Sequence, residues 1–164
     1  MPALEKLNIL VVDDNRDMRA LLRRILNAGG VRQVREAEDG ASALEMLRDE
    51  GCDIVLTDLA MTPMDGLAFA RAVRAARDTL NPQIPIIMIS GHTEKHRVEA
   101  ARDAGVTEFL VKPITPRGLF ARIHDILERP RSFVNTARYF GPDRRRKAVE
   151  NYAGPFRRRA DRSR

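Results

Sequence analysis

The first 129 residues alternate between two hydrophobic patterns. Short runs rich in β-branched and aliphatic residues recur five times, and four of these runs are apolar at nearly every position. Near-continuous apolar character indicates strands that are buried on both faces, as in a parallel sheet. The run at 33–37 is more polar, which suits an edge strand. The predicted strands cover residues 7–13, 33–37, 52–58, 84–90 and 107–111.

The segments between these runs have the periodicity of amphipathic helices. The clearest spans residues 18–26, where apolar residues recur at i, i+3, i+4, i+7 and i+8 before Gly29 and Gly30 end the helix. Segment 94–104 offers only Val98 and Ala101 to a core, so we expect this helix to be the most loosely held. Five strands alternating with five helices predict an α/β fold, a doubly wound five-stranded parallel sheet of the flavodoxin-like strand order 2-1-3-4-5.

Polar residues follow the strands at the edge where such folds bind ligands. Asp13 and Asp14 end the first predicted strand and Asp58 ends the third, and these two strands are neighbours in the expected order. An Asp after a strand is often only a helix cap. Three crowded carboxylates, however, repel one another and need a cation, for which oxygen ligands favour Mg²⁺. Ser90 and Lys112 end the fourth and fifth strands and add a hydroxyl and an ammonium group.

This set of groups suits phosphoryl transfer. A carboxylate can attack phosphorus and become an acyl phosphate. Mg²⁺ and a lysine neutralise the phosphoryl oxygens, and a hydroxyl donates a hydrogen bond to another of them.

Over residues 5–128 the chain resembles the receiver-domain family of bacterial response regulators, especially its single-domain, CheY-like members. The motifs that carry the resemblance are VVDDN at 11–15, a strand ending in Asp58, Met64-Asp65-Gly66, Ser90 at the end of the fourth strand, and Lys112-Pro113.

The resemblance implies an acceptor and a metal site. Asp58 would be the phosphoacceptor in a two-component phosphorelay, with a histidine kinase or phosphotransferase as the donor. Asp14, Asp58 and the carbonyl of Ala60 would bind Mg²⁺ directly, and Asp13 would bind it through water.

The resemblance also implies phosphoryl-binding and switch residues. Lys112 would contact the phosphoryl group through a loop with a cis bond to Pro113, and Ser90 would form the switch pair with Phe109. The family's usual aromatic residue here is Tyr. Its usual proline after the acceptor comes one residue late in this chain, at Pro63.

A phosphatase of the haloacid dehalogenase type is the enzyme alternative, because it too forms an aspartyl phosphate. Such enzymes need a second Asp two residues after the nucleophile, and that position is Ala60. The chain has no P-loop pattern either. We therefore expect a signalling protein without enzymatic activity.

Charge divides the chain into two parts. Residues 1–129 carry 18 Lys or Arg and 20 Asp or Glu, a net charge of −2, whereas residues 130–164 carry 11 and 3, a net charge of +8. No apolar run approaches the ~20 residues of a membrane span, and the single Cys52 cannot form an internal disulfide. We predict a cytoplasmic protein without membrane insertion, with a receiver domain at 1–129 and an arginine-rich tail at 130–164.

The tail contains an internal repeat. Tyr139-Phe-Gly-Pro-Asp-Arg-Arg-Arg146 recurs 13 residues later as Tyr152-Ala-Gly-Pro-Phe-Arg-Arg-Arg159. We expect Gly-Pro to set a turn in each copy. Arg outnumbers Lys ten to one in the tail, and Arg binds phosphates bidentately, stacks on planar rings and pairs with guanine O6 and N7.

Two copies of one motif suggest a ligand with two equivalent halves, and cyclic di-GMP fits this description. Over residues 138–162 the tail resembles the arginine-rich extension of CheY-like cyclic-di-GMP effectors, whose receiver domains are linked to motility and the flagellar motor switch. The implied ligand residues are Tyr139, Gly141, Pro142, Asp143, Arg144, Arg145, Arg146, Tyr152, Gly154, Pro155, Arg157, Arg158, Arg159 and Asp161.

Two other functions stay open at this point. The chain could be a pure phosphorelay receiver with an incidental tail. Alternatively, the tail could bind nucleic acid, which we expect less; such binding would weaken steeply with salt and show little base preference.

Overall fold

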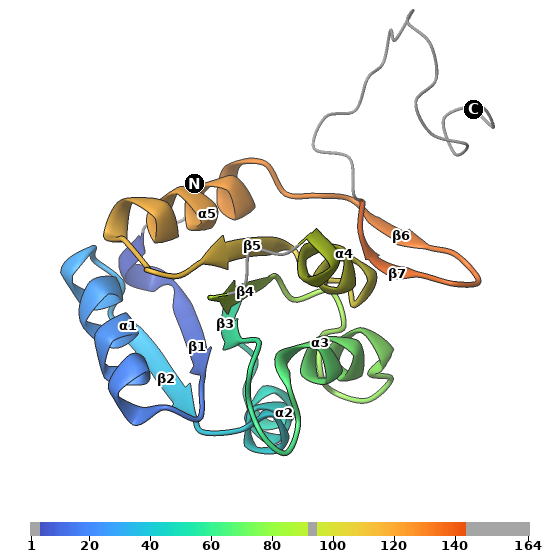
Figure 1. Ribbon diagram of the computed structural model, residues 1–164, viewed down its shortest axis with the longest axis horizontal. Coiled ribbons are helices and arrows are strands. Elements are labelled where there is room, and N and C mark those ends of the chain that lie inside the picture. The colour runs from blue at the N-terminus through green and yellow to red at the C-terminus, as the bar shows by residue number, and fades with distance from the viewer. Residues whose placement is uncertain (1–3, 92–94, 144–164) are drawn as a thin grey trace, which may run out of the picture.

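Five parallel strands form the central sheet of the protein (Figure 1). The computed structural model describes residues 4–91 and 95–143. The strand order is β2-β1-β3-β4-β5, which confirms the predicted doubly wound, flavodoxin-like topology. The strands are β1 (Asn8–Val12), β2 (Gln33–Ala37), β3 (Ile54–Asp58), β4 (Ile86–Ser90) and β5 (Glu108–Val111).

Four of the strands are shorter than the apolar runs that predicted them. β4 begins only after Pro85, which has no N–H to donate to a ladder, although its carbonyl still accepts from Val55. Before β3, the side chain of Asp53 accepts a hydrogen bond from the Asn8 amide at 2.8 Å. Leu7 and Ile84, which lie beyond these ends, are buried without being paired as strands.

Helices cover both faces of the sheet (Figure 1). Those on one face are α1 (Arg16–Ala28) and α5 (Pro116–Glu128), and those on the other are α2 (Gly40–Asp49), α3 (Gly66–Ala75) and α4 (Lys95–Asp103). Alternate strand residues enter the two cores, so Ile9 and Val11 face α1 and α5 while Leu10 and Val12 face the other helices. No described helix is long and apolar enough to cross a bilayer.

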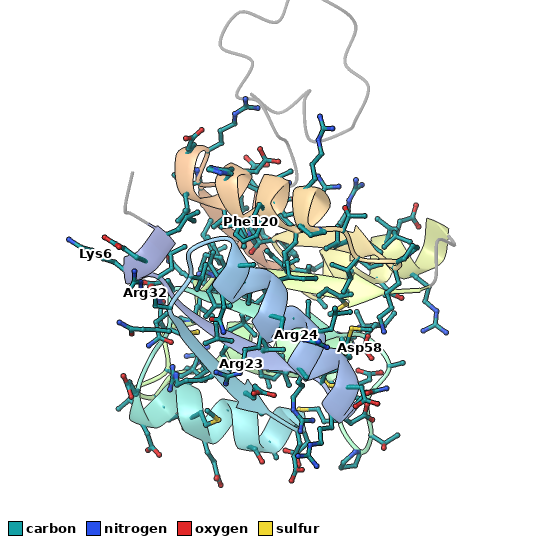
Figure 2. All side chains as sticks on the ribbon, turned by 90° about the vertical axis from the view of Figure 1, so that its left-hand side faces the viewer. Lys6, Arg23, Arg24, Arg32, Asp58 and Phe120 are labelled. Atoms are coloured by element: carbon teal, nitrogen blue, oxygen red, sulfur yellow. The ribbon has the colours of Figure 1, made fainter. Side chains whose placement is uncertain are left out.

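α1 and α5 pack closely where α1 ends. A Cβ on Gly29 would lie 2.0 Å from the ring of Phe120, so a larger residue here would require that ring to move. Figure 2 views this side, with Phe120 on α5 and with Arg23 and Arg24 on α1. Arg19 and Arg23 both form ion pairs with Glu36, which ties α1 to the edge strand β2.

A short antiparallel hairpin follows α5. It consists of β6 (Phe133–Asn135) and β7 (Phe140–Pro142), with Val134 opposite Gly141. In Figure 1 it lies beside α3, which β7 contacts. The first part of the tail is therefore folded against the receiver domain.

The expected Gly-Pro turn is wrong for the first repeat copy. Gly141 and Pro142 belong to strand β7, and the hairpin turns instead at 136–139, where Thr136 donates to the carbonyl of Tyr139 at 2.8 Å. The glycine is needed for a different reason, because a Cβ there would lie 3.0 Å from the Cα of Gly105. Backbone packs directly on backbone at this point.

Candidate functional site: an acidic cluster at the carboxyl edge of the sheet

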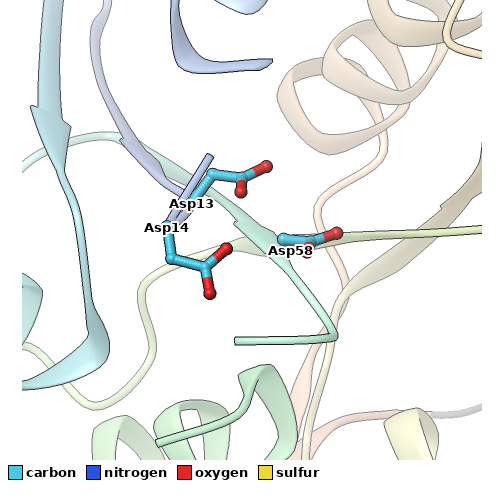
Figure 3. Close-up of side chains that lie close together, drawn as sticks. All are labelled: Asp13, Asp14 and Asp58. Carbon is cyan, nitrogen blue, oxygen red and sulfur yellow. The ribbon is translucent and has the colours of Figure 1, made fainter. Parts of the chain in front are cut away.

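Three carboxylates meet where β1 and β3 end. Val12 pairs with Thr57 in the ladder, so the next residues, Asp13 and Asp58, emerge side by side. One oxygen from each of Asp13, Asp14 and Asp58 lies within 4.8 Å of the others (Figure 3). Asp13 and Asp58 are buried and Asp14 is exposed. The site is thus closed by the sheet on one side and reached from solvent through Asp14.

Lys112 supplies the cation that the sequence predicts. Its Nζ lies 3.1 Å from Oδ1 of Asp58. The lysine directly follows β5, and its amide donates to the carbonyl of Ser90 at 2.8 Å, which holds it at this edge. Its peptide bond to Pro113 is cis, as the family resemblance implies, and the Thr62–Pro63 bond, for which we made no such prediction, is cis as well.

The expected switch pair lies on β4 and β5. Ser90 is buried at the end of β4. Phe109 is half-buried and pairs with Met88, while Ser90 pairs with Val111. Ser90 and Phe109 therefore lie on the same face of the sheet, offset by two residues along neighbouring strands. Ala60, whose carbonyl is the implied metal ligand, is exposed and lies two residues after Asp58.

Two residues that support the site were not singled out from the sequence. Arg19 of α1 donates to the carbonyl of Asp13 at 2.7 Å. Asn15 donates its amide to Oδ1 of Asp13 at 2.9 Å and caps α1 by accepting from the amides of Asp17 and Met18. The VVDDN motif contained a signal for Asn15, because an Asn before a helical pattern is a common N-cap, whereas nothing local marks Arg19.

Burial and the neighbouring charges perturb the pKa of Asp13. Burial raises the pKa of Asp13 most, and the charges of Asp58 and Asp14 raise it further, while the Asn15 amide and Lys112 act in the opposite direction. The folded protein therefore binds a proton at Asp13 more tightly than the unfolded chain does. An acid of this kind lowers stability as pH rises from its ordinary pKa toward its raised pKa.

Replacing Asp13 with Asn is accordingly expected to stabilise the protein at pH 7 in the absence of Mg²⁺. The amide keeps an oxygen for the Asn15 amide but removes the buried charge, so we expect Tm to rise by roughly 2–4 °C, or about 1 kcal/mol. The gain should vanish below about pH 4, where the wild-type carboxyl is protonated in both states. Thermal unfolding followed by circular dichroism, at pH 7 and below about pH 4, measures the gain in Tm and its disappearance. The exposed Asp49→Asn serves as control, and a lower Tm for Asp13→Asn at pH 7 would contradict the burial argument.

Of the tail residues implied as ligand contacts, the structure describes four. The hydroxyl of Tyr139 donates to the carbonyl of Pro142 at 2.8 Å, Gly141 and Pro142 are buried, and the amide of Asp143 donates to the carbonyl of Ser132. They lie in the hairpin, away from the carboxylate cluster. The residues outside the described part are Arg144, Arg145, Arg146, Tyr152, Gly154, Pro155, Arg157, Arg158, Arg159 and Asp161.

Known proteins are similar in sequence to this domain. Residues 9–124 match the family described as "Response regulator receiver domain". The chemotaxis protein CheY of Pseudomonas aeruginosa is 36% identical over 123 residues, which are 75% of this chain and 98% of that protein. CheY-3 of Vibrio cholerae is 33% identical over 125 residues, 76% of this chain and 95% of that protein.

Solved structures share the fold. Chemotaxis protein CheY4 of Vibrio cholerae is similar with a TM-score of 0.67 and 28% identity, over 73% of this chain and 98% of that one. The receiver domain of the Pseudomonas aeruginosa sensor histidine kinase PA1611, whose structure has a magnesium ion coordinated in the active-site cleft, has a TM-score of 0.64 and 25% identity, over 72% of this chain and 94% of that one. With its sheet order, its acidic cluster and these matches, the chain belongs to the response regulator receiver domain family.

Proposed function

We propose that the protein is a response regulator that accepts a phosphoryl group on Asp58, and that its output is binding rather than catalysis. The observation that carries this proposal is the position of Asp58, with Lys112 Nζ at 3.1 Å and the oxygens of Asp13 and Asp14 within 4.8 Å. A histidine kinase or phosphotransferase is the donor that fits a receiver domain.

The three carboxylates fit Mg²⁺. Their oxygens are hard ligands, and one oxygen from each carboxylate lies close enough to the others to share one ion. Three carboxylates brought together at a partly buried site favour a cation beside them. Asp13, Asp14 and Asp58 would hold the ion together with the carbonyl of Ala60. When bound, Mg²⁺ supplies positive charge that offsets the phosphoryl oxygens.

The chain's own residues then carry the transfer. An oxygen of the Asp58 carboxylate forms the new bond to phosphorus while the bond from phosphorus to the donor breaks, and the donor leaves with that electron pair. Lys112 stands where it can neutralise a phosphoryl oxygen, and the Ser90 hydroxyl can donate to another.

We further propose that the tail binds cyclic di-GMP and that the protein acts on motility, with the flagellar motor switch as its partner. The repeat of an aromatic residue, Gly-Pro and three arginines supports a ligand with two equivalent halves. Relatives named as chemotaxis proteins support a role in motility. Neither a phosphorelay role nor nucleic-acid binding explains the spacing of the two copies.

Titration calorimetry of the full chain at moderate salt tests the tail. We expect cyclic di-GMP to bind at least about tenfold more tightly than cyclic di-AMP, because bidentate arginine contacts distinguish guanine from adenine by about 1–3 kcal/mol. Arg145→Ala should weaken binding by about tenfold or more. The exposed Arg32→Ala, on the receiver, is the control and should bind like wild type. Equal affinity for both dinucleotides, with a steep loss in salt, would instead favour the nucleic-acid alternative.

A further inference from the structure

Arg74, near the end of α3, is a buried arginine that the phosphoryl site does not use. Its residue exposure is 6%, and burial lowers its pKa to about 10. None of the ion pairs within 4–91 and 95–143 involves it. Its guanidinium instead donates to the carbonyls of Gly105 at 2.9 Å, Pro82 at 2.8 Å and Ile84 at 2.7 Å. A buried charge without a counterion is expensive, so backbone carbonyls from two loops must compensate it.

The hairpin lies on the other side of this guanidinium. The ring centroid of Phe133 is 4.9 Å from the guanidinium carbon of Arg74, a cation–π distance. Phe140 of β7 packs against Phe133 with ring centroids 5.5 Å apart. Arg74 thus joins three segments that are distant in sequence: the loop before β4, the turn before β5 and the hairpin.

Two glycines bring the hairpin into contact at the same place. Gly105 has φ of +91°, and a Cβ on it would lie 2.8 Å from Cγ of Arg74 and 3.2 Å from the carbonyl oxygen of Phe140. A Cβ on Gly141 would lie 3.0 Å from Cα of Gly105. The ion pair of Arg131 with the buried Glu108, at 3.3 Å, fastens the segment that leads into β6. The hairpin is therefore docked on the receiver by three kinds of contact.

We infer that Arg74 is a positioning residue for the tail: by docking the β6–β7 hairpin it fixes the first repeat copy on the receiver domain. This inference rests on the proposed binding of cyclic di-GMP by the tail. Tyr139, Gly141 and Pro142 of the first copy are held in the docked hairpin, and Arg144 comes two residues after Pro142, where β7 ends. The described part of the first copy, up to Asp143, is thereby held against the domain. A binding segment whose root is already ordered loses less conformational entropy when the ligand arrives.

Arg74 could instead be only a stabilising residue of α3, and the two roles predict different results. If it only stabilised the domain, weakening its contact with Phe133 would change Tm but not the affinity of the tail. If it positions the first copy, the loss of the aromatic face should release the hairpin and weaken ligand binding while the sheet stays intact.

Phe133→Leu is the decisive variant, because it keeps an apolar side chain but removes the aromatic face and leaves the carbonyl contacts of Arg74 in place. Arg74→Met keeps a long apolar side chain and removes the guanidinium of the cation–π contact. Phe133→Tyr keeps an aromatic ring at position 133 and is a second control. Arg71→Met is the matched control, since Arg71 is exposed on the same helix. All variants are made in the full chain.

Hydrogen exchange and calorimetry with cyclic di-GMP are then compared. In Phe133→Leu and Arg74→Met we expect the amides of Thr136 and Asp143, which are hydrogen-bonded within the hairpin, to exchange at least about tenfold faster, with sheet amides unchanged. Affinity for cyclic di-GMP should fall by about tenfold, and Phe133→Tyr and Arg71→Met should match wild type. Should Arg74→Met fail to fold, Phe133→Leu alone decides.

Several results would overturn the inference. Unchanged exchange of the hairpin amides in Phe133→Leu would show that the stacking does not dock the hairpin. Faster exchange with unchanged affinity would show that the first copy works without being held. If wild type bound no cyclic di-GMP, the proposed tail function and the affinity claim would fail together, while the exchange data would still decide whether Arg74 docks the hairpin.

Discussion

Replacing Asp58 with Asn is expected to abolish phosphoryl transfer to the protein. The amide keeps the shape of the side chain but is not a nucleophile, and it removes the carboxylate that lies 3.1 Å from Lys112. Incubation with Mg²⁺ and acetyl phosphate, followed by intact-protein mass spectrometry, should show one added phosphoryl group in wild type. The variant should show less than about one-hundredth of that incorporation, in line with the loss of a group that acts only in the transition state.

Asp49→Asn is the matched control for this experiment, because Asp49 is an exposed carboxylate at the end of α2. It should be phosphorylated like wild type. Chelation of Mg²⁺ should lower incorporation in both wild type and control, since the acidic cluster would then lack its cation. Undiminished incorporation in Asp58→Asn would mean that another residue is the acceptor.

Replacing Gly66 with Ala is expected to have the second largest effect, and to act on stability and chemistry together. A Cβ at this position would lie 2.4 Å from the carbonyl oxygen of Asp58 and 3.0 Å from Cα of Leu59. Both are backbone atoms, so the clash cannot be relieved by turning a side chain. We expect unfolding free energy to fall by about 1–3 kcal/mol, as for other overpacked sites. Phosphoryl incorporation should fall as well, because the acceptor must shift with its backbone.

Gly51→Ala is the control for Gly66→Ala. Gly51 has no atom within 4 Å of the position that a Cβ would take, and its φ lies outside the left-handed region. This substitution should be neutral or slightly stabilising. Urea unfolding measures the stability of both variants, and the mass-spectrometric assay measures phosphorylation. Equal stability of the two variants would contradict the predicted clash, and undiminished incorporation in Gly66→Ala would show that the acceptor keeps its position.

The sequence predicted the sheet and the acidic cluster because both depend on local signals. Buried parallel strands are apolar at nearly every position, and parallel strands that lie side by side bring their carboxyl ends to one edge. Asp13, Asp58 and Lys112 could therefore be placed together without knowledge of any contact. Strand ends were less predictable. Asp53 and Pro85 lie near the beginnings of two apolar runs, and strand pairing begins only after them.

The hairpin was beyond sequence reasoning for a physical reason. Its strands have three residues each, too few to show alternation, and its apolar positions are Phe133, Val134 and Phe140. Its partners, Arg74 and Gly105, lie in the receiver and carry no local mark of that role. The Gly-Pro dipeptide predicts a turn, whereas in the structure Gly141 allows a close backbone contact with Gly105.

The hydrogen bond of the Tyr139 hydroxyl makes this residue a fluorescence probe of the hairpin. The chain contains no tryptophan and only two tyrosines, Tyr139 and Tyr152, and the receiver has Phe109 where a family member usually has tyrosine. All tyrosine emission of the native protein therefore arises from the repeat copies, and the receiver domain contributes no tyrosine signal near the acidic cluster. Because the phenol of Tyr139 donates to the carbonyl of Pro142, release of the hairpin should alter its emission. The unlabelled protein thus carries its own fluorophore for events in the tail.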